Sequence, residues 1–300
     1  MDDHPLPMTI AGREHDLGGG FKVRRLLPDF RRRSVGPFVF FDHFGPVTVQ
    51  PGEDHDVRPH PHIGLATVTY LFEGAMMHRD SLGSVQLIEP GAVNWMTAGR
   101  GIVHSERKPG HLQQQAFVNH GLQLWVGLPA DQEESAPAFT HTPAGAIPQA
   151  EIGPARVRVL VGEGFGQRSP VAALSPTLYL DIDLPAGGTF ELPPLAAELA
   201  VYPIEGALRV DGEPMAPHAL LVLQPGRAVR VEAAGPARLV AIGGEPLGHR
   251  FMYWNFVSSR RERILQASDD WAAQRFAPVP GETEFIPLPT TRFAPAEPMS

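Results

Sequence analysis

The sequence predicts an all-β protein that contains two similar β domains. Short apolar stretches, each interrupted by Gly, Pro or Asp after about ten residues, are typical of β-sandwiches and barrels. Gly and Pro contribute 31 and 32 of the 300 residues, and both disfavour the interior of a helix. Hydrophobic residues make up 43% of the chain and charged residues 19%, which indicates a folded chain with a sizeable core.

Eight segments are predicted to be β-strands. In Leu178–Leu184, four aliphatic residues alternate with Tyr179, Asp181 and Asp183, and this period of two predicts a half-buried strand. The expected strands are Thr67–Phe72, Val85–Ile88, Leu122–Val126, Val157–Val161, Leu178–Leu184, Leu199–Ile204, Leu220–Leu223 and Leu239–Ile242.

One helix is expected near the C-terminus. Ser259 and Glu262 have the spacing of a capping box, and Pro278 ends the helical pattern. The residues that share one face of this helix are Ile264, Ala267, Ser268 and Trp271.

An internal repeat suggests that the chain contains the same β arrangement twice. Tyr70–Ala75 matches Tyr202–Ala207, and Pro90–Val93 matches Pro225–Val229 with one inserted residue. Each copy reads as a strand, a Glu-Gly turn, a second strand and a Pro-Gly turn, although turn chemistry alone makes both dipeptides common.

The Pro-rich segment Asp131–Pro154 is expected to link the two copies. This places an N-terminal domain in residues 1–140 and a C-terminal domain in residues 141–300. The helix and a Pro-rich tail then belong to the second domain.

Charge and composition exclude several functions. The 25 basic and 33 acidic residues give a net charge of −8, which argues against a nucleic-acid-binding surface. The absence of Cys excludes disulfides, thiolate catalysis and Cys-based metal sites, so nitrogen and oxygen atoms must hold any metal. The N-terminus lacks an apolar signal core, and no apolar run is long enough to span a membrane. We therefore expect a soluble cytoplasmic protein with no membrane partner.

The histidines concentrate in one part of the chain, with eight of the 13 between His43 and His120. His60 and His62 are separated by two positions, as are His104 and Glu106, and in a strand this spacing puts both side chains on one face. A single His-x-His pair is often a surface or turn feature. If the two strands are neighbours in a barrel, however, three imidazoles and one carboxylate converge, which favours a metal site.

These motifs resemble the pirin family of the cupin superfamily. The resemblance implies a fold of two tandem cupin (jelly-roll-type) β-barrels with one short C-terminal helix. It also implies that the first barrel carries the metal, with ligands at His60, His62, His104 and Glu106. The segments that carry the resemblance are Arg58–Gly64, Tyr70–Gly74, Trp95–Glu106, Gly121–Pro129 and Trp254–Ser259.

One departure from this pattern lies in the first barrel, and the repeat adds an expectation for the second. Many cupins carry Glu a few residues after the His-x-His pair, and here Ala66 stands at the expected position. In the second barrel, the residues that the repeat aligns with the four ligands are apolar, so we expect no metal ligands there. These residues are Leu192, Pro194, Leu239 and Ala241.

The donor set is close to the facial site of non-heme Fe(II) oxygenases, and it leaves an ion that prefers six ligands room for substrate or O2. Fe(II), Mn, Ni, Cu and Zn all accept these donors, and the resemblance favours Fe(II). Pirin-like proteins include quercetin 2,3-dioxygenases. The resemblance therefore implies a metal-dependent dioxygenase that opens flavonols such as quercetin with O2. His60, His62 and His104 would then be ligands only, and Glu106 would also be the general base.

Two other functions stay open. Some pirins are linked to transcription factors, so a non-enzymatic iron-binding redox sensor that acts through a protein partner is the alternative. The net charge of −8 favours a protein partner over direct contact with DNA. A purely structural zinc ion is the third possibility. Uptake of O2 with a flavonol would distinguish the enzyme from the other two.

Residues around the motifs carry weaker expectations. The resemblance places His78 near the pocket, where it would hydrogen-bond a ligand or the substrate. Other histidines, His43 and His120 among them, are expected to be surface or satisfied core residues. Five apolar residues either line a mouth for flat aromatic rings or are ordinary core: Phe40, Phe41, Phe44, Met76 and Met77.

Overall fold

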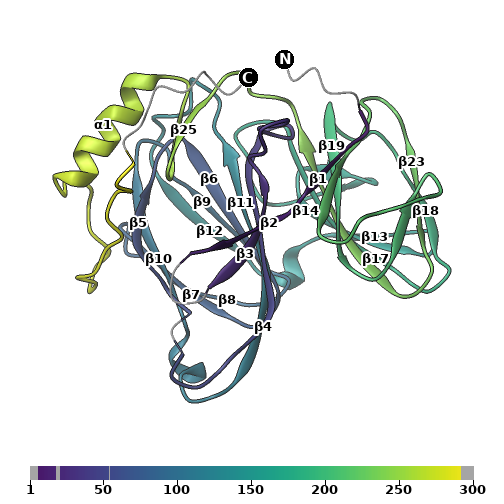
Figure 1. The fold of residues 1–300 in the computed structure, drawn as a ribbon, viewed down its shortest axis with the longest axis horizontal. Coiled ribbons are helices and arrows are strands. Elements are labelled where there is room, and N and C mark those ends of the chain that lie inside the picture. The colour runs from purple at the N-terminus through teal and green to yellow at the C-terminus, as the bar shows by residue number, and fades with distance from the viewer. Residues whose placement is uncertain (1–5, 18–20, 54, 292–300) are drawn as a thin grey trace. The chain divides into compact units, whose positions relative to one another are not determined.

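The computed structural model describes residues 6–17, 21–53 and 55–291, which form mostly β-structure (Figure 1). The one α-helix within these residues is α1 (Arg261–Ala272), and two short 3-10 helices are η1 (Gly110–Leu112) and η2 (Ala144–Ala146). The prediction of an all-β fold with one short C-terminal helix is confirmed. Across the same described ranges, no helix is both long and apolar enough to cross a membrane.

The chain divides into two compact units, and each is built from three separate segments. The unit that contains the clustered histidines, here called the histidine unit, covers Glu14–Val23, Asp42–His141 and Leu247–Ser300. The other, here called the aliphatic unit, covers Met1–Arg13, Arg24–Phe41 and Thr142–Pro246. The division of the chain into domains at residues 140 and 141 stays a prediction.

Two sheets form the barrel with the histidines. The seven-stranded sheet has the spatial order β12 (Ala138–Thr142), β9 (Val93–Thr97), β6 (Leu65–Glu73), β11 (Phe117–Gly127), β4 (Phe38–Val49), β3 (Lys22–Leu27) and β2 (Arg13–Asp16). The four-stranded sheet has the order β5 (Val57–His62), β10 (Ile102–Arg107), β7 (Met76–Asp80) and β8 (Val85–Ile88).

The second barrel also consists of a seven-stranded and a four-stranded sheet. The larger has the order β1 (Met8–Ala11), β22 (Ala219–Val222), β19 (Glu198–Glu205), β24 (Ala237–Gly244), β17 (Thr177–Leu184), β14 (Ala155–Val161) and β13 (Gln149–Ile152). The smaller has the order β18 (Thr189–Leu192), β23 (Val229–Ala233), β20 (Leu208–Val210) and β21 (Glu213–Pro214). Two hairpins complete the list of strands: β15 (Glu163–Gly164) with β16 (Gln167–Arg168), and β25 (Phe251–Tyr253) with β26 (Phe256–Ser258).

The Glu-Gly half of the internal repeat corresponds to a shared strand order. The other half does not, because Pro90–Val93 leads into β9 and Pro225–Val229 into β23, which are not counterparts. In each barrel the strand that ends in Glu-Gly, β6 or β19, lies near the middle of the larger sheet. Gly74 and Gly206 both have positive φ, and a Cβ atom on either would lie 2.5 Å from a carbonyl oxygen. Both turns therefore require glycine. The barrels differ at one edge, where β12 lies beside β9 in one and the N-terminal strand β1 lies beside β22 in the other.

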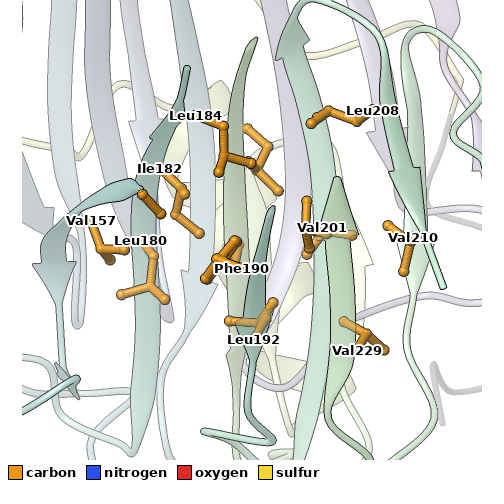
Figure 2. Close-up of a cluster of buried hydrophobic side chains, with 14 of the residues drawn as sticks. Val157, Leu180, Ile182, Leu184, Phe190, Leu192, Val201, Leu208, Val210 and Val229 are labelled. Carbon is orange, nitrogen blue, oxygen red and sulfur yellow. The ribbon is translucent and has the colours of Figure 1, made fainter. Parts of the chain in front are cut away.

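The interior of the second barrel is aliphatic, and both of its sheets contribute to it. Phe190 and Leu192 on β18 pack in the same buried cluster as Leu180 on β17 and Val201 on β19. Figure 2 shows these side chains pointing into the space between the strands. Burial of apolar surface at this scale is the dominant favourable contribution to folding, at about 1.5–3 kcal/mol for each large side chain.

Helix α1 packs on the outside of the histidine barrel. Its buried face consists of Ile264, Ala267 and Trp271, in agreement with the predicted face, and these side chains share one buried cluster with Ile63 and Val103. Figure 1 shows the helix outside the strands of this barrel. We expected the helix to belong to the second domain, and these contacts instead place it in the histidine unit.

The predicted helix cap is wrong. The N-cap residue is Arg260, and no side chain caps the helix. The hydroxyl of Ser259 instead donates to Oε2 of Glu133 at 3.0 Å, and the Ser259 backbone N–H donates to Oε1 at 2.7 Å. A buried carboxylate thus replaces the first helical turn as the partner of Ser259.

Seven of the eight predicted strands lie within strands of the structure, and Leu220–Leu223 extends one residue beyond β22, but two related expectations need correction. The expected linker Asp131–Pro154 contains β12 and β13, and Glu133 within it is buried. Strand β17 is buried on both faces rather than one. Its Asp181 is accommodated because Arg238 donates to both carboxylate oxygens, at 2.8 and 2.7 Å.

Candidate metal centre

Strands β5 and β10 bring the predicted histidines together. They pair antiparallel, with His60 opposite His104 and His62 opposite Ile102, so the expectation that these strands are neighbours is confirmed. The three histidines are 7%, 1% and 1% exposed. One ligand nitrogen of each lies within 4.8 Å of those of the other two, and Nε2 of His62 is 3.1 Å from Nε2 of His104. These three residues could hold a metal ion.

Burial keeps the three imidazoles neutral. Removal from water lowers the pKa of His60 to about 4 and lowers the pKa values of His62 and His104 well below the ordinary value. The adjacent rings lower these pKa values further, because a positive charge on one imidazole disfavours a second. A neutral imidazole keeps a lone pair, so the donor set fits a divalent metal ion at neutral pH.

A hydrogen bond fixes which nitrogen of His60 carries that lone pair, and ring packing orients His62. The Nδ1–H of His60 donates to the carbonyl oxygen of Arg58 at 2.8 Å, which leaves Nε2 as the free donor. The ring of His62 lies edge-on to Trp125, with centroids 5.1 Å apart and planes at 78°. Both rings are therefore held in place before any ion binds.

His104 is oriented by a buried chain of two further side chains. Nε2 of His78 is 3.1 Å from Oδ2 of Asp80, and Nδ1 of His78 is 3.4 Å from Nδ1 of His104. When His78 is neutral and donates its Nε2 proton to the Asp80 carboxylate, its other nitrogen accepts the Nδ1 proton of His104. Nε2 of His104 is then left with its lone pair. The expectation that His78 hydrogen-bonds a predicted ligand is confirmed.

Glu106 lies two residues after His104 on β10 and is buried, at 7% exposed. Its Oε1 accepts a hydrogen bond of 3.2 Å from Nε2 of Gln123, and Oε1 of Gln123 accepts one of 2.7 Å from Thr69. Burial raises the pKa of Glu106 to about 7, although hydrogen bonds from Gln123 and Thr69 lower it. Glu106 does not belong to the group of three close donors, and its role as fourth ligand stays a prediction.

The structure shows which residue of β6 faces the interior near the position where Ala66 was expected. Thr67 and Thr69 are paired with Trp125 and Gln123, which face the histidines and Glu106. Because strand residues alternate between faces, the side chain of Ala66 lies on the opposite face of β6. Thr67 is therefore the residue on the interior side at this point of the strand.

The register of the second barrel also revises the expected equivalences. By strand order, β10 corresponds to β23, whereas Leu239 and Ala241 lie on β24, the counterpart of β11. The loops between equivalent strands differ in length, so one constant offset cannot align all of them. The counterparts of β5 and β10 are β18 and β23, and their side chains in the buried cluster are all apolar: Phe190, Leu192, Val229, Val231 and Ala233.

Of the two interpretations of the apolar residues, the structure supports core packing for Phe41, Phe44 and Met76. Phe44 and Met76 are buried in one cluster with Phe21 and Leu71, and Phe41 packs against Tyr202 with centroids 5.0 Å apart. The alternative interpretation, ordinary core packing, holds for these side chains. His43 and His120 are core residues, because both rings are buried and their Nε2 atoms are 2.8 Å apart.

Sequence reasoning missed four residues that surround the donors: Thr69, Asp80, Gln123 and Trp125. Asp80 follows His78 at the i, i+2 spacing that identified the ligands, and this was a signal that could have found it. Gln123 is a polar residue inside an apolar strand, which was a second signal. Nothing local distinguishes Thr69 or Trp125, because cross-strand pairing alone brings them to the site.

A pair of jelly-roll-type barrels, one of which encloses three converging imidazoles, defines a two-domain cupin. Comparison with known proteins agrees with this class. Residues 20–126 match the Pirin family, and residues 179–277 match the pirin C-terminal cupin domain. The chain belongs to the pirin family of the cupin superfamily.

Three relatives illustrate the range of descriptions within the family. A pirin-like protein of Caulobacter vibrioides is 46% identical over 95% of this chain and 99% of its own. A Pseudomonas aeruginosa protein, whose name proposes quercetin 2,3-dioxygenase activity, is 39% identical over 89% of this chain and 84% of its own. The crystal structure of a quercetin 2,3-dioxygenase from Acinetobacter baumannii superimposes with a TM-score of 0.91 at 33% identity, over 98% of both chains.

Proposed function

We propose that this protein is a metal-dependent dioxygenase of the pirin type that opens flavonols such as quercetin with O2. His60, His62, His104 and Glu106 would hold one divalent ion, which we take to be Fe(II). The observation that carries the proposal is the buried group of three neutral imidazoles, with a carboxyl group of raised pKa two residues beyond one of them. The relatives described as quercetin 2,3-dioxygenases support the choice of substrate.

A divalent ion bound here would supply positive charge that favours a deprotonated flavonol oxygen and an open position for O2. The side chains supply the rest. Glu106 is suited to remove the proton from the flavonol 3-hydroxyl, because a general base is most effective when its pKa lies near the working pH. Gln123 holds Oε1 of Glu106, so the proton would be taken up by Oε2.

The decisive variant is Glu106→Gln, which keeps the size of the side chain but removes its charge and basicity. At matched metal occupancy, kcat for quercetin should fall by about 10²–10⁴-fold, the usual contribution of a positioned acid–base group. The measurement is O2 uptake together with CO release. Glu73→Gln is the matched control, since Glu73 is an exposed carboxylate at the end of β6 and should turn over as the wild type does.

The same assay separates the alternatives. A metal-loaded Glu106→Gln variant within a few-fold of the wild type would reduce Glu106 to a ligand without a role as base. A wild type that binds Fe(II) but consumes no O2 with any flavonol would exclude the dioxygenase and favour the redox sensor that acts through a protein partner. Zinc that resists chelators in a protein without turnover would favour a structural ion.

A further inference from the structure

A segment after α1 crosses the outer face of the strands that carry the histidines. This segment, residues 279–288, is here called the C-terminal strap. Val279 is buried in the same cluster as Ile63 and Val103. The backbone N–H of Ile286 donates to the carbonyl oxygen of Pro59 at 2.8 Å, directly before His60 on β5. The strap is therefore attached to one of the two strands of the candidate metal centre.

Glu282 attaches the strap to the other strand. Oε1 accepts a hydrogen bond of 2.5 Å from the hydroxyl of Ser105, and Oε2 accepts two from the guanidinium of Arg107, at 3.1 Å from Nε and 2.5 Å from an Nη atom. The Glu282 side chain is 6% exposed, and Ser105 is fully buried. Because strand residues alternate, Ser105 and Arg107 lie on the outer face of β10, and Glu106 between them points inward.

The point of attachment coincides with an irregularity in the sheet. The register between β10 and β5 shifts between His104 and Glu106, so that Glu106 pairs with Val57. Pro59 lies on the edge strand β5, and its carbonyl oxygen faces the strap and not β10. The shift in register itself disrupts the ladder locally. The sheet by itself therefore holds Glu106 less firmly than it would hold a residue in a regular ladder.

Glu282 carries its charge at this position. Burial by itself would raise the pKa of Glu282, but hydrogen bonds from Arg107 and Ser105 and the charges of Arg107 and Arg79 lower it below the ordinary value. Hydrogen bonds between ionised partners are about twice as strong as neutral ones and are more directional. The contact is thus strong enough to fix the backbone on both sides of Glu106.

We propose that Glu282 is a positioning residue for the metal centre, which fixes β10 so that Glu106 stays beside the three imidazoles. This inference rests on the ligand assignment made under the proposed function. Glu282 touches neither the ion nor the substrate, and it acts through Ser105 and Arg107. The C-terminal strap thereby makes metal affinity depend on a residue far along the chain from the ligands.

The test measures Ni(II) affinity by competition with a chromophoric chelator and records the electron paramagnetic resonance spectrum of the Cu(II)-loaded protein. Glu282→Gln should weaken Ni(II) binding by about 10–100-fold, as expected for loss of an outer partner of a ligand, and should change the Cu(II) spectrum. Glu284→Gln is the matched control on the same strap. Its side chain is 59% exposed with one contact of 3.4 Å to Arg107, and it should match the wild type. Ser105→Ala removes one of the same contacts and serves if Glu282→Gln does not fold.

A double-mutant comparison separates positioning from general stabilisation. In a Glu106→Gln background, Glu282→Gln should weaken Ni(II) binding by less than about two-fold, because the residue that it positions has already lost its charge. If Glu282→Gln lowered the melting temperature of the metal-free protein but left Ni(II) affinity and the Cu(II) spectrum unchanged, its role would be structural and the inference overturned. A wild type that binds Ni(II) but does not consume flavonol would overturn the proposed function alone. A wild type that binds no metal would overturn both.

Discussion

Strands β5 and β10 bring His60, His62 and His104 together in one barrel, and their counterparts β18 and β23 bring Phe190, Leu192 and Val231 together in the other. The neighbouring strands continue the contrast, because Asp80 on β7 pairs with His104, whereas Val210 on β20 pairs with Val231. The same strand order therefore surrounds a polar interior in the histidine unit and an aliphatic interior in the aliphatic unit. The fold specifies the positions, and the side chains at a few inward positions decide whether they form a site or a core.

The two interiors have opposite energetic consequences. Phe190 and Leu192 stabilise their unit by about 1.5–3 kcal/mol each when they leave water. Burial of His60, by contrast, lowers its pKa to about 4, which shows that its charged form is disfavoured in the barrel. The histidine unit compensates outside the barrel, where α1 and Phe256 pack on Ile63 and Val103. Apolar packing on the far side of β5 and β10 thus supports strands whose inner faces are polar.

A core substitution in the aliphatic unit should give the largest effect. Phe190→Ala should lower the free energy of unfolding by about 3–5 kcal/mol, because it removes a buried ring and leaves a cavity. All four Trp residues lie in the histidine unit, so Trp fluorescence follows that unit and hydrogen exchange of β18 and β23 follows the other. Exchange should accelerate in β18 and β23 at a denaturant concentration where Trp fluorescence stays native.

The control is Leu265→Ala on the solvent-facing side of α1, which should change stability by less than about 0.5 kcal/mol. If Phe190→Ala shifted the Trp transition and the β18 exchange by the same amount, the two units would unfold as one cooperative body. Neither unit would then have a free energy of unfolding of its own.

Acid should destabilise the histidine unit selectively in the metal-free protein. The folded-state pKa of His60 is about 4 against an ordinary 6.5, so between these values the unfolded chain binds a proton that the folded chain does not. Stability should therefore fall as the pH decreases from about 6.5 to about 4, by about 3 kcal/mol for His60 alone. His62 and His104 act in the same direction. Glu106 acts in the opposite direction, because its pKa is raised and it takes up a proton first in the folded state.

The three histidines lower the free energy of unfolding in acid and Glu106 raises it, so the net effect of acid is a loss of stability. Urea unfolding followed by Trp fluorescence at pH 7 and pH 5 measures this loss, and His60→Phe, which cannot titrate, provides the control. A Trp transition with the same midpoint at both pH values in the wild type would show that the imidazoles are not held neutral by burial.

The fold was predictable because its signals are local. The alternation in Leu178–Leu184, the Glu-Gly turns and the i, i+2 spacing of His60 and His62 all arise within one strand or turn. Each could be interpreted without knowledge of what the neighbouring strand would be. The resemblance to the pirin family then supplied the pairing that local signals lack.

The partners around the site were not predictable because they depend on register between distant strands. Gln123 reaches Glu106 only because β11 lies across the barrel from β10. Ser259 fits a capping box in sequence, yet Glu133 offers its hydroxyl a buried carboxylate from 126 residues away. The wrong alignment of His104 with Leu239 had the same origin, because loop lengths differ between the barrels and no local signal records them.

The smallest expected effect concerns Asp80 on β7, whose counterpart β20 contributes Leu208 and Val210 to the buried aliphatic cluster. Asp80→Asn keeps an oxygen for the backbone N–H groups of Leu82 and Ser84 but places an amide donor beside His78. His78 would then move its proton to Nδ1, and His104 could no longer donate to it.

The proton of His104 would shift to Nε2 and occupy the lone pair that faces His62. Ni(II) affinity should therefore fall by about 10–100-fold while the fold is retained, and ¹⁵N shifts of the metal-free protein should report the changed tautomers. Asp131→Asn, an exposed position in the same unit, should leave both measurements unchanged. An Asp80→Asn variant with wild-type affinity and wild-type tautomers would mean that β10 alone orients His104. The difference between the two barrels would then reside in the donors themselves and not in the residues behind them.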